Sequence, residues 1–340
     1  MLHGHGDDAY RYPHQIVADF STNVWTGGEP AGLKEHLFGQ WDLIRKYPEV
    51  VAEGLAGQVA RHHQVKPEEV LVTNGTTESI YLLAQAFSGQ GTTITIPAFA
   101  EYEDACRMHR HALHFLPWQE LATIPRLQTD LLFLCNPNNP TGSVFPDVEA
   151  LLAKNPHTLV VVDEAFIHFT LSLQTAVPLL RRYPNLLILR SMTKAFAIPG
   201  LRLGYLLGQE TRINQLKAFK PPWSVNALAI AAGKYIFDHL PHLQVPVGQL
   251  LKDKEALAAR LQQEAGVQVE PSHTHFFLAQ TATGTAARLK HYLVEHFGLL
   301  IRDAANFRGL GPKHFRIATL GPAQDERLIA ALVQWKNHCS

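Results

Sequence analysis

Short apolar runs recur along the first two thirds of the chain, and they constrain its fold more than any other feature. Most of them are apolar on successive residues, as expected for strands that are buried on both faces of a sheet. Segments with helical periodicity, such as TESIYLLAQAF and DVEALLAK, separate many of the runs. This order predicts an α/β fold with a mostly parallel sheet between helices. The expected strands span 68–73, 92–96, 111–116, 130–135, 158–163, 185–190 and 201–208.

The pattern changes after about residue 240. A helical stretch, QLLKDKEALAARLQQEA, is followed by strand-like THFFLAQ, a second helical stretch and the runs LLIRD and FRIATL. A chain of 340 residues is also too long for one small core. We therefore expect a large domain over 46–240 and a smaller α+β domain built from 1–45 and 241–340.

The composition indicates a cytoplasmic protein without a nucleic-acid or membrane partner. Thirty basic and thirty acidic side chains cancel, so no strongly basic surface is expected. The N-terminus has no apolar signal segment, and no apolar run approaches the roughly 20 residues that span a bilayer. Cys106, Cys135 and Cys339 are scattered and odd in number, which is typical of a reducing compartment.

Nineteen histidines make a metal site worth considering. His109, His111 and His114 are close in sequence, but they fall where a helix end runs into a strand and need not share a face. No cysteine or carboxylate cluster with a recognised metal spacing accompanies them. We therefore expect no metal ligands.

Polar residues follow several of the expected strands, at the sheet edge where ligands bind in folds of this kind. Asp163 ends an apolar strand, where a carboxylate is costly unless it meets a cation or good donors. Lys194 lies just past the next strand, and desolvation there would lower the pKa of its amine and make it nucleophilic. Ser191 and Arg202 flank it with a hydroxyl and a bidentate donor, which suit a phosphate dianion.

Two turns complete this edge. Asn74-Gly75-Thr76-Thr77 precedes an expected helix, whose N-terminus offers backbone N–H groups and a favourable dipole to a phosphate. Alone, this segment could equally be an ordinary N-cap at Thr77. NPNNPTG at 136–142 is typical of a rigid, non-helical turn. An amide there could donate to a phenolate oxygen, although a plain tight turn explains the segment as well.

NPNNPTG, VVVDEAF and SMTKAFAIPGLRLGY, in this order and spacing, resemble the class I/II aminotransferases of pyridoxal-5′-phosphate (PLP) fold type I. The resemblance runs over essentially the whole chain and implies a PLP-dependent homodimer with shared active sites. It implies that Lys194 carries the cofactor as a Schiff base and later moves a proton, that Asp163 pairs with the pyridinium nitrogen, and that Asn139 hydrogen-bonds the ring O3′. The cofactor phosphate would be held by Gly75, Thr76, Thr77, Ser191 and Arg202.

The same resemblance assigns four further positions. Phe99, in PAFAEY, would stack on the pyridine ring, and Tyr47, in RKYPE, would reach the cofactor phosphate of the neighbouring subunit. Arg316, in FRIAT, would hold the substrate α-carboxylate as a bidentate pair. Phe166 stands where many relatives have a tyrosine, which removes one donor to O3′ and counts against simple transamination.

Within this family the chain most resembles the threonine-phosphate decarboxylases of cobalamin biosynthesis, with the histidinol-phosphate aminotransferases next. The matching pieces are HGDD, DFSTN, RKYPE, NGTTES, PAFAEY, DEAFIHF and PPWSVNALA. DEAF and PWSVNA favour the decarboxylases. The implied reaction is decarboxylation of L-threonine O-3-phosphate to aminopropanol phosphate, and the alternative is transfer of an amino group to a 2-oxo acid.

Both groups of relatives act on phosphorylated substrates, and the chain offers residues for one. Arg302, in LLIRDAANF, matches an arginine that binds the substrate phosphate, and His5 is a plausible second contact. Asn23 and Asn226 could orient the substrate. A surface charge is the plainer alternative for Arg302, and a loosely ordered terminus is the plainer alternative for His5.

Overall fold

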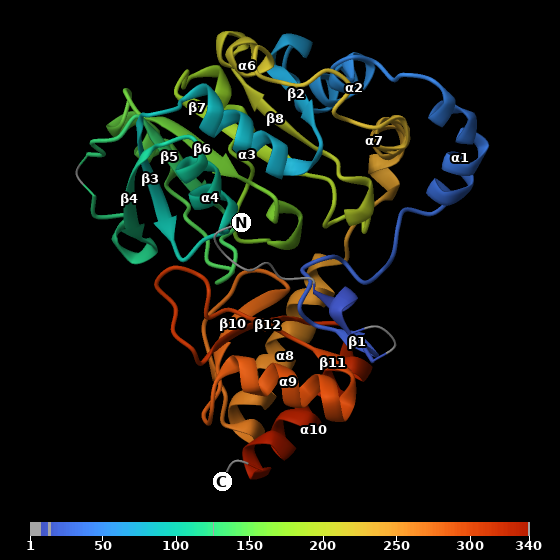
Figure 1. Ribbon diagram of the computed structural model, residues 1–340, viewed down its shortest axis with the longest axis vertical. Helices are drawn as coiled ribbons and strands as arrows, with labels where there is room; N and C mark the ends of the chain where they lie inside the picture. The colour runs from blue at the N-terminus through green and yellow to red at the C-terminus, as the bar shows by residue number, and fades with distance from the viewer. Residues whose placement is uncertain (1–7, 13–14, 125, 339–340) are drawn as a thin grey trace.

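A seven-stranded sheet between two layers of helices forms the larger part of the molecule, and a four-stranded sheet with its own helices forms the smaller part (Figure 1). The computed structural model describes residues 8–12, 15–124 and 126–338. The predicted combination of an α/β fold and a smaller α+β part is confirmed.

The large sheet has the strand order β2-β8-β7-β6-β5-β3-β4. Neighbouring strands are parallel, except that β8 runs antiparallel to both β2 and β7. Its seven strands are β2 (Val70–Thr73), β3 (Gly91–Ile96), β4 (Ala112–Pro117), β5 (Leu131–Cys135), β6 (Leu159–Asp163), β7 (Leu186–Ser191) and β8 (Gly204–Gly208). The seven predicted runs therefore correspond one to one with these strands.

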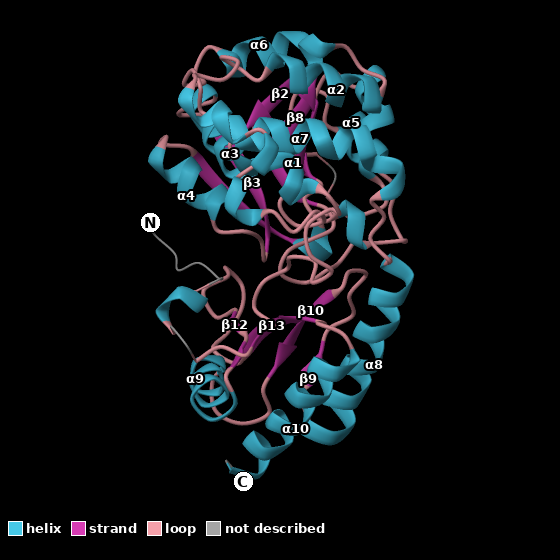
Figure 2. Cartoon of the chain, turned by 90° about the vertical axis from the view of Figure 1, so that its right-hand side faces the viewer, coloured by secondary structure: helices cyan, strands magenta, loops and turns pink. Residues whose placement is uncertain are grey.

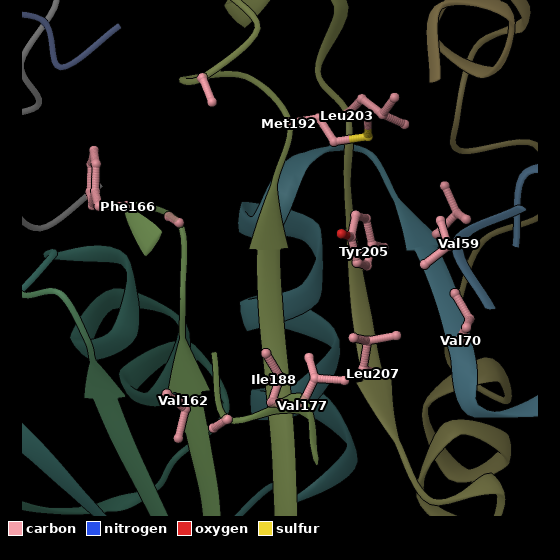
Figure 3. Close-up of a cluster of buried hydrophobic side chains, with 14 of the residues drawn as sticks. Val59, Val70, Val162, Phe166, Val177, Ile188, Met192, Leu203, Tyr205 and Leu207 are labelled. Carbon is pink, nitrogen blue, oxygen red and sulfur yellow. The ribbon is translucent and has the colours of Figure 1, made fainter. Parts of the chain in front are cut away.

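Alternate residues of the central strands enter different cores. In β6, Val160 and Val162 pack into one hydrophobic cluster, whereas Leu159 and Val161 pack into another on the opposite face. Because both faces are covered, neither set can be polar, which explains the uninterrupted apolar runs. Figure 3 shows part of the first cluster, in which Phe166 lies beyond the end of the sheet.

Helices cover both faces of the large sheet (Figure 2). One layer contains α2 (Glu53–His63), α5 (Val148–Lys154) and α7 (Ala227–His239). The opposite layer contains α3 (Gly75–Ala86), α4 (Glu101–Met108) and α6 (Glu210–Lys217). Among the described residues, no helix combines the length and apolar content that a bilayer span requires.

The smaller part has an antiparallel sheet in the order β12-β13-β10-β9, and a two-stranded pair, β1 with β11. A separate hydrophobic core fills the space between its strands and helices. Its elements are β1 (Ala18–Asp19), α8 (Val247–Ala265), β9 (Gln268–Val269), β10 (Phe276–Gln280), α9 (Ala286–Phe297), β11 (Leu299–Leu300), β12 (Arg302–Asp303), β13 (His314–Ala318) and α10 (Pro322–His338).

The first 45 residues divide between the two parts. β1 pairs with β11 in the smaller part. In contrast, α1 (Leu33–Gly39) and the 3-10 helix Trp41–Arg45 pack on α7, and Leu33 is buried in a core of the large sheet. Packing thus places 33–45 beside the large sheet, whereas the predicted domain boundaries at residues 46 and 240 stay a prediction.

Candidate active site

A cavity of about 390 Å³ lies where the C-terminal ends of the large sheet's strands meet the smaller part. Side chains from both parts line it, so the site lies between the two parts. The sequence-predicted residues that line it are Asn23, Thr76, Thr77, Phe99, Asn139, Asp163, Ser191, Lys194, Arg202, Arg302 and Arg316. Among the described lining residues, four have basic side chains and only Asp163 is acidic, which makes the cavity suitable for anions.

The carboxylate of Asp163 is fully buried at the end of β6. The hydroxyl of Tyr102 donates to its Oδ2 at 2.6 Å, and the backbone N–H of Ala165 donates to its Oδ1 at 2.9 Å. Burial nevertheless raises the pKa of Asp163 to about 6, against the effect of both donors. Two neutral donors therefore do not replace the cation that a buried carboxylate requires.

A tight cradle forms at the N-terminus of α3. Gly75 has φ +72°, and a Cβ there would lie 2.7 Å from Nη2 of Arg202. A Cβ on Gly204 would meet the backbone nitrogen of Thr76 at 2.9 Å, so β8 also approaches this turn closely. The first N–H groups of a helix have no acceptor within the helix. Together with the Arg202 guanidinium, these groups form a site suited to a phosphate.

Lys194 follows β7 and lines the same cavity as Asp163 and Arg202. Its backbone carbonyl accepts a hydrogen bond from the N–H of Trp25 at 3.0 Å, which ties the N-terminal segment to this loop. Next to it, the Ser191 Oγ lies 2.8 Å from the Thr193 Oγ1. Both hydroxyls are buried, so their hydrogen-bonding directions are restricted by this contact.

Two buried arginines stand side by side in the smaller sheet. Arg302 on β12 and Arg316 on β13 are directly opposite in the antiparallel register, and both line the cavity. Burial, and next the charge of Arg302, lower the pKa of Arg316 to about 9. Like charges opposite each other destabilise a sheet, so this arrangement favours anions between or in front of the two guanidinium groups.

Polar neighbours hold Arg316 in one orientation. Nη1 donates to Oδ1 of Asn139, and Nη2 donates to the backbone carbonyl of Ser21 at 2.6 Å. Its Nε is buried without a hydrogen-bond partner in the described part of the chain, as is Oδ1 of Asn23. An unpaired buried donor and acceptor beside one cavity are expected where a polar ligand completes the hydrogen bonding.

Four predicted residues do not line this cavity. Gly75 forms the backbone of the cradle described above. The Tyr47 side chain is 83% exposed and packs on Trp223, with 4.9 Å between ring centroids. The Asn226 amide caps α7 by accepting from the N–H of Ala229 at 2.8 Å. His5 lies outside the described residues.

Several lining residues were not identified from the sequence. The largest omission is Tyr102, which reaches Asp163 from α4 and stacks on Phe133 with 4.9 Å between centroids. Its position in PAFAEY, three residues after Phe99, was the available signal. Asn306 was also missed, although it accepts a hydrogen bond from Nη2 of Arg302 at 2.8 Å. Other lining residues not predicted are Ser21, Thr22, Ala100, Cys135, Ala165, Thr193 and Phe307.

Comparisons with known proteins show which proteins the chain is similar to. The threonine-phosphate decarboxylase of Salmonella typhimurium is 35% identical over 335 residues, which cover 94% of this chain and 91% of that protein. A histidinol-phosphate aminotransferase of Caldanaerobacter subterraneus subsp. tengcongensis is 32% identical over 302 residues, with 85% and 84% covered.

A solved structure gives the same picture. The L-threonine-O-3-phosphate decarboxylase from Porphyromonas gingivalis superposes with a TM-score of 0.91 at 39% identity, over 94% of this chain and 100% of that one. A family model described as aminotransferase class I and II matches residues 17–332. The chain therefore belongs to the class I and II aminotransferase family, whose members are PLP-dependent enzymes.

Proposed function

We propose that this chain is a PLP-dependent decarboxylase that converts L-threonine O-3-phosphate to aminopropanol phosphate. The observation that carries the proposal is the pair Arg302 and Arg316, directly opposite each other at the cavity. A substrate with both a carboxylate and a phosphate ester supplies one anion for each guanidinium, and it relieves the repulsion between them.

The residues of the cavity fit the cofactor. Asp163 is a buried carboxylate with a raised pKa, and a protonated pyridine nitrogen would supply a cationic partner for it. The cradle at Gly75 and Arg202 has the N–H groups and the charge for the cofactor phosphate. Because Oδ1 of Asn139 accepts from Arg316, its Nδ2 donor is the group left for the ring O3′. We assign these contacts to Asp163, Gly75, Thr76, Thr77, Ser191, Arg202, Asn139, Phe99 and Lys194.

Bound PLP supplies an electron sink for charge that develops at the Cα of an amino acid. In decarboxylation the bond between Cα and the carboxylate breaks, CO₂ leaves, and a proton takes its place at Cα. Lys194 is the basic group at the cavity that we assign to deliver this proton. Asp163 would keep the ring nitrogen protonated, which the electron sink requires.

Features of the substrate end favour decarboxylation over amino transfer. Both terminal nitrogens of Arg316 already donate to protein acceptors, Asn139 and Ser21. Its contact to the substrate carboxylate would therefore be weaker, which suits a reaction in which the carboxylate leaves as CO₂. Phe166 presents no hydroxyl and packs edge-on against Phe276, with 4.9 Å between ring centroids. Identities of 35% and 39% to decarboxylases support the same reading. We assign substrate contacts to Arg302, Arg316 and Asn23, with His5 and Asn226 as further candidates.

We further propose that the enzyme is a homodimer in which Tyr47 reaches the partner's cofactor phosphate. Tyr47 and Trp223 form an exposed aromatic pair, and the Trp223 N–H bonds the Val50 carbonyl at 2.9 Å. Trp41 and Ile44, nearby in the chain, are also more than half exposed. Exposed apolar side chains in such number usually mark an interface.

We also propose that the protein is cytoplasmic. The buried free thiols of Cys106 and Cys135 are consistent with a reducing compartment.

The first prediction concerns the reaction. The holoenzyme should release CO₂ and aminopropanol phosphate from L-threonine O-3-phosphate without any added 2-oxo acid. Arg302→Gln should raise KM on the order of tenfold or more, because a bidentate charged contact to the phosphate is lost. Mass spectrometry of the products and steady-state kinetics measure both effects. Arg260→Gln is the control, since Arg260 pairs with Glu264 on the surface of α8.

Amino transfer that requires a 2-oxo acid, with histidinol phosphate as donor and no CO₂ released, would contradict the decarboxylase proposal. An equal KM for wild type and Arg302→Gln would contradict the role of Arg302.

The second prediction concerns Tyr102. Tyr102→Phe removes a donor that lowers the pKa of Asp163, so this pKa should rise further above about 6. At a pH near the shifted pKa, more of the carboxyl is protonated and pairs poorly with a pyridinium. The Kd of PLP should rise about tenfold, as expected when a hydrogen bond to a charged group is lost. Equilibrium dialysis of the apoprotein measures it.

The effect should shrink as the pH rises past the shifted pKa, since Asp163 is then ionised in both proteins. Cys135 and Glu164 also face Asp163 and are unchanged in the variant. Tyr205→Phe is a matched control, because its buried hydroxyl pairs with His63 at 2.9 Å, away from the cavity. Equal effects of the two substitutions would show that Tyr102 is merely structural.

The third prediction concerns assembly. Sedimentation equilibrium should give a mass of about twice 37.9 kDa. Tyr47→Phe should remain dimeric but bind PLP more weakly, because only the hydroxyl that reaches the partner's phosphate is removed. A monomeric wild type, or a Tyr47→Phe variant with unchanged Kd for PLP, would overturn the shared-site proposal.

A further inference from the structure

One loop of the smaller part carries several residues of the substrate end. It follows β12 and spans 304–310, and Asn306 and Phe307 from it line the cavity beside Arg302. Asn306 accepts from Nη2 of Arg302 at 2.8 Å, and the Arg302 guanidinium lies 5.2 Å from the centroid of the Phe307 ring. The Arg302 guanidinium is therefore held by two side chains of this loop, together with the backbone carbonyl of Asp303, which accepts from its Nη1 at 2.8 Å.

The side chain of the next residue in this loop, Arg308, contacts the larger part of the molecule. Nε of Arg308 donates to Oε2 of Glu103 at 2.8 Å, and its Nη2 donates to Oε1 at 2.7 Å. This bidentate pair joins the loop to α4. The Arg308 guanidinium also lies 4.1 Å from the centroid of the Phe115 ring on β4, so both its edge and its face are held by the large part.

The pair differs from an ordinary surface ion pair. The Glu103 side chain is only 7% exposed, whereas that of Arg308 is 39% exposed. Burial raises the pKa of Glu103, but hydrogen bonds from Arg308 and Arg107 outweigh this and lower the pKa overall. A buried carboxylate with planar, two-point pairing restrains geometry far better than a mobile single contact between exposed chains.

The helix that carries Glu103 is itself part of the site. The preceding residue in α4 is Tyr102, whose hydroxyl donates to Asp163. The ion pair thus links α4, which contacts Asp163 through Tyr102, to the loop that carries Asn306 and Phe307. Arg308 supplies two side-chain hydrogen bonds from this loop to α4.

We propose that Arg308 is a positioning residue that locks the 304–310 loop onto Glu103 and thereby holds Arg302 over the substrate phosphate. This inference rests on the proposed role of Arg302 in binding that phosphate. Without the lock, the loop occupies the binding-competent position for a smaller fraction of the time. The apparent affinity for the phosphate falls by the same fraction, while the chemical step in the bound state is preserved.

Arg107 offers a matched control. It lies on α4, four residues after Glu103, and its Nε donates to the same Oε1 at 2.7 Å. Both arginines neutralise one carboxylate, but only Arg308 connects the two parts of the molecule. Arg308→Gln and Arg107→Gln therefore remove the same charge from the same partner with different mechanical consequences.

The test uses the holoenzyme and two readouts. Arg308→Gln should raise KM for L-threonine O-3-phosphate about tenfold, with kcat within about twofold of wild type, which corresponds to a competent fraction reduced to about one tenth. The Kd for inorganic phosphate, measured by calorimetry with PLP already bound, should rise by a similar factor. Arg308→Lys should give a KM and a Kd between those of wild type and Arg308→Gln, because an ammonium cannot make the two-point contact. Arg107→Gln should leave both readouts within about twofold of wild type.

Equal changes in Arg308→Gln and Arg107→Gln, or a fall in kcat alone, would overturn the positioning role. The two proposals fail in different ways. If wild type does not act on threonine phosphate, the decarboxylase assignment is lost, and the Kd for inorganic phosphate still decides the role of Arg308. If inorganic phosphate does not bind the wild-type holoenzyme, or binds the Arg308→Gln variant equally well, the lock is refuted.

Discussion

The buried carboxylate of Asp163 is the constraint from which the rest of the site follows. An ionised group at the end of a fully covered strand costs several kcal/mol unless a cation pairs with it. Tyr102 and the Ala165 N–H reduce that cost, yet the pKa of Asp163 remains raised. A cation that binds beside the Asp163 carboxylate would therefore stabilise its ionised form. A protonated heteroaromatic nitrogen would meet this requirement, and we propose that the PLP pyridine nitrogen does so.

The basic side chains that line the cavity come from both parts of the molecule. Lys194 and Arg202 come from the segments around β7 and β8, whereas Arg302 and Arg316 come from the smaller sheet. The three guanidinium groups of Arg202, Arg302 and Arg316 are close to only one acidic lining residue among those described. In the proposed function, the cofactor phosphate and the anionic groups of the substrate would balance these charges.

The sequence was most informative where local pattern determines structure. The apolar runs located the large-sheet strands because both faces of that sheet are buried. The run at 201–208 began too early, since Pro199–Leu201 form a 3-10 turn and Arg202 takes a positive φ of 57°. Residues 33–45 pack on α7, a long-range contact that their own pattern does not encode.

Site residues that depend on pairing between remote segments were harder to predict. The contact between Tyr102 and Asp163 joins positions 61 residues apart, and the opposition of Arg302 and Arg316 depends on strand register. The link between Arg308 and Glu103 spans 205 residues. Asn226 was predicted to contact the substrate, but its side-chain oxygen instead accepts a hydrogen bond that caps α7. Composition and spacing identify candidate groups, but only the tertiary fold shows which groups meet.

The most direct measurement is the location of the cofactor on the chain. The holoenzyme is reduced with borohydride, digested, and searched by mass spectrometry for a lysine that carries the pyridoxyl group. Lys220 and Lys254 are buried and pair with Glu78 and with Glu255, respectively. The account predicts that the group is found on Lys194 and that Lys194→Ala loses the yellow absorbance. Labelling of another lysine, or an unaltered spectrum in Lys194→Ala, would contradict it.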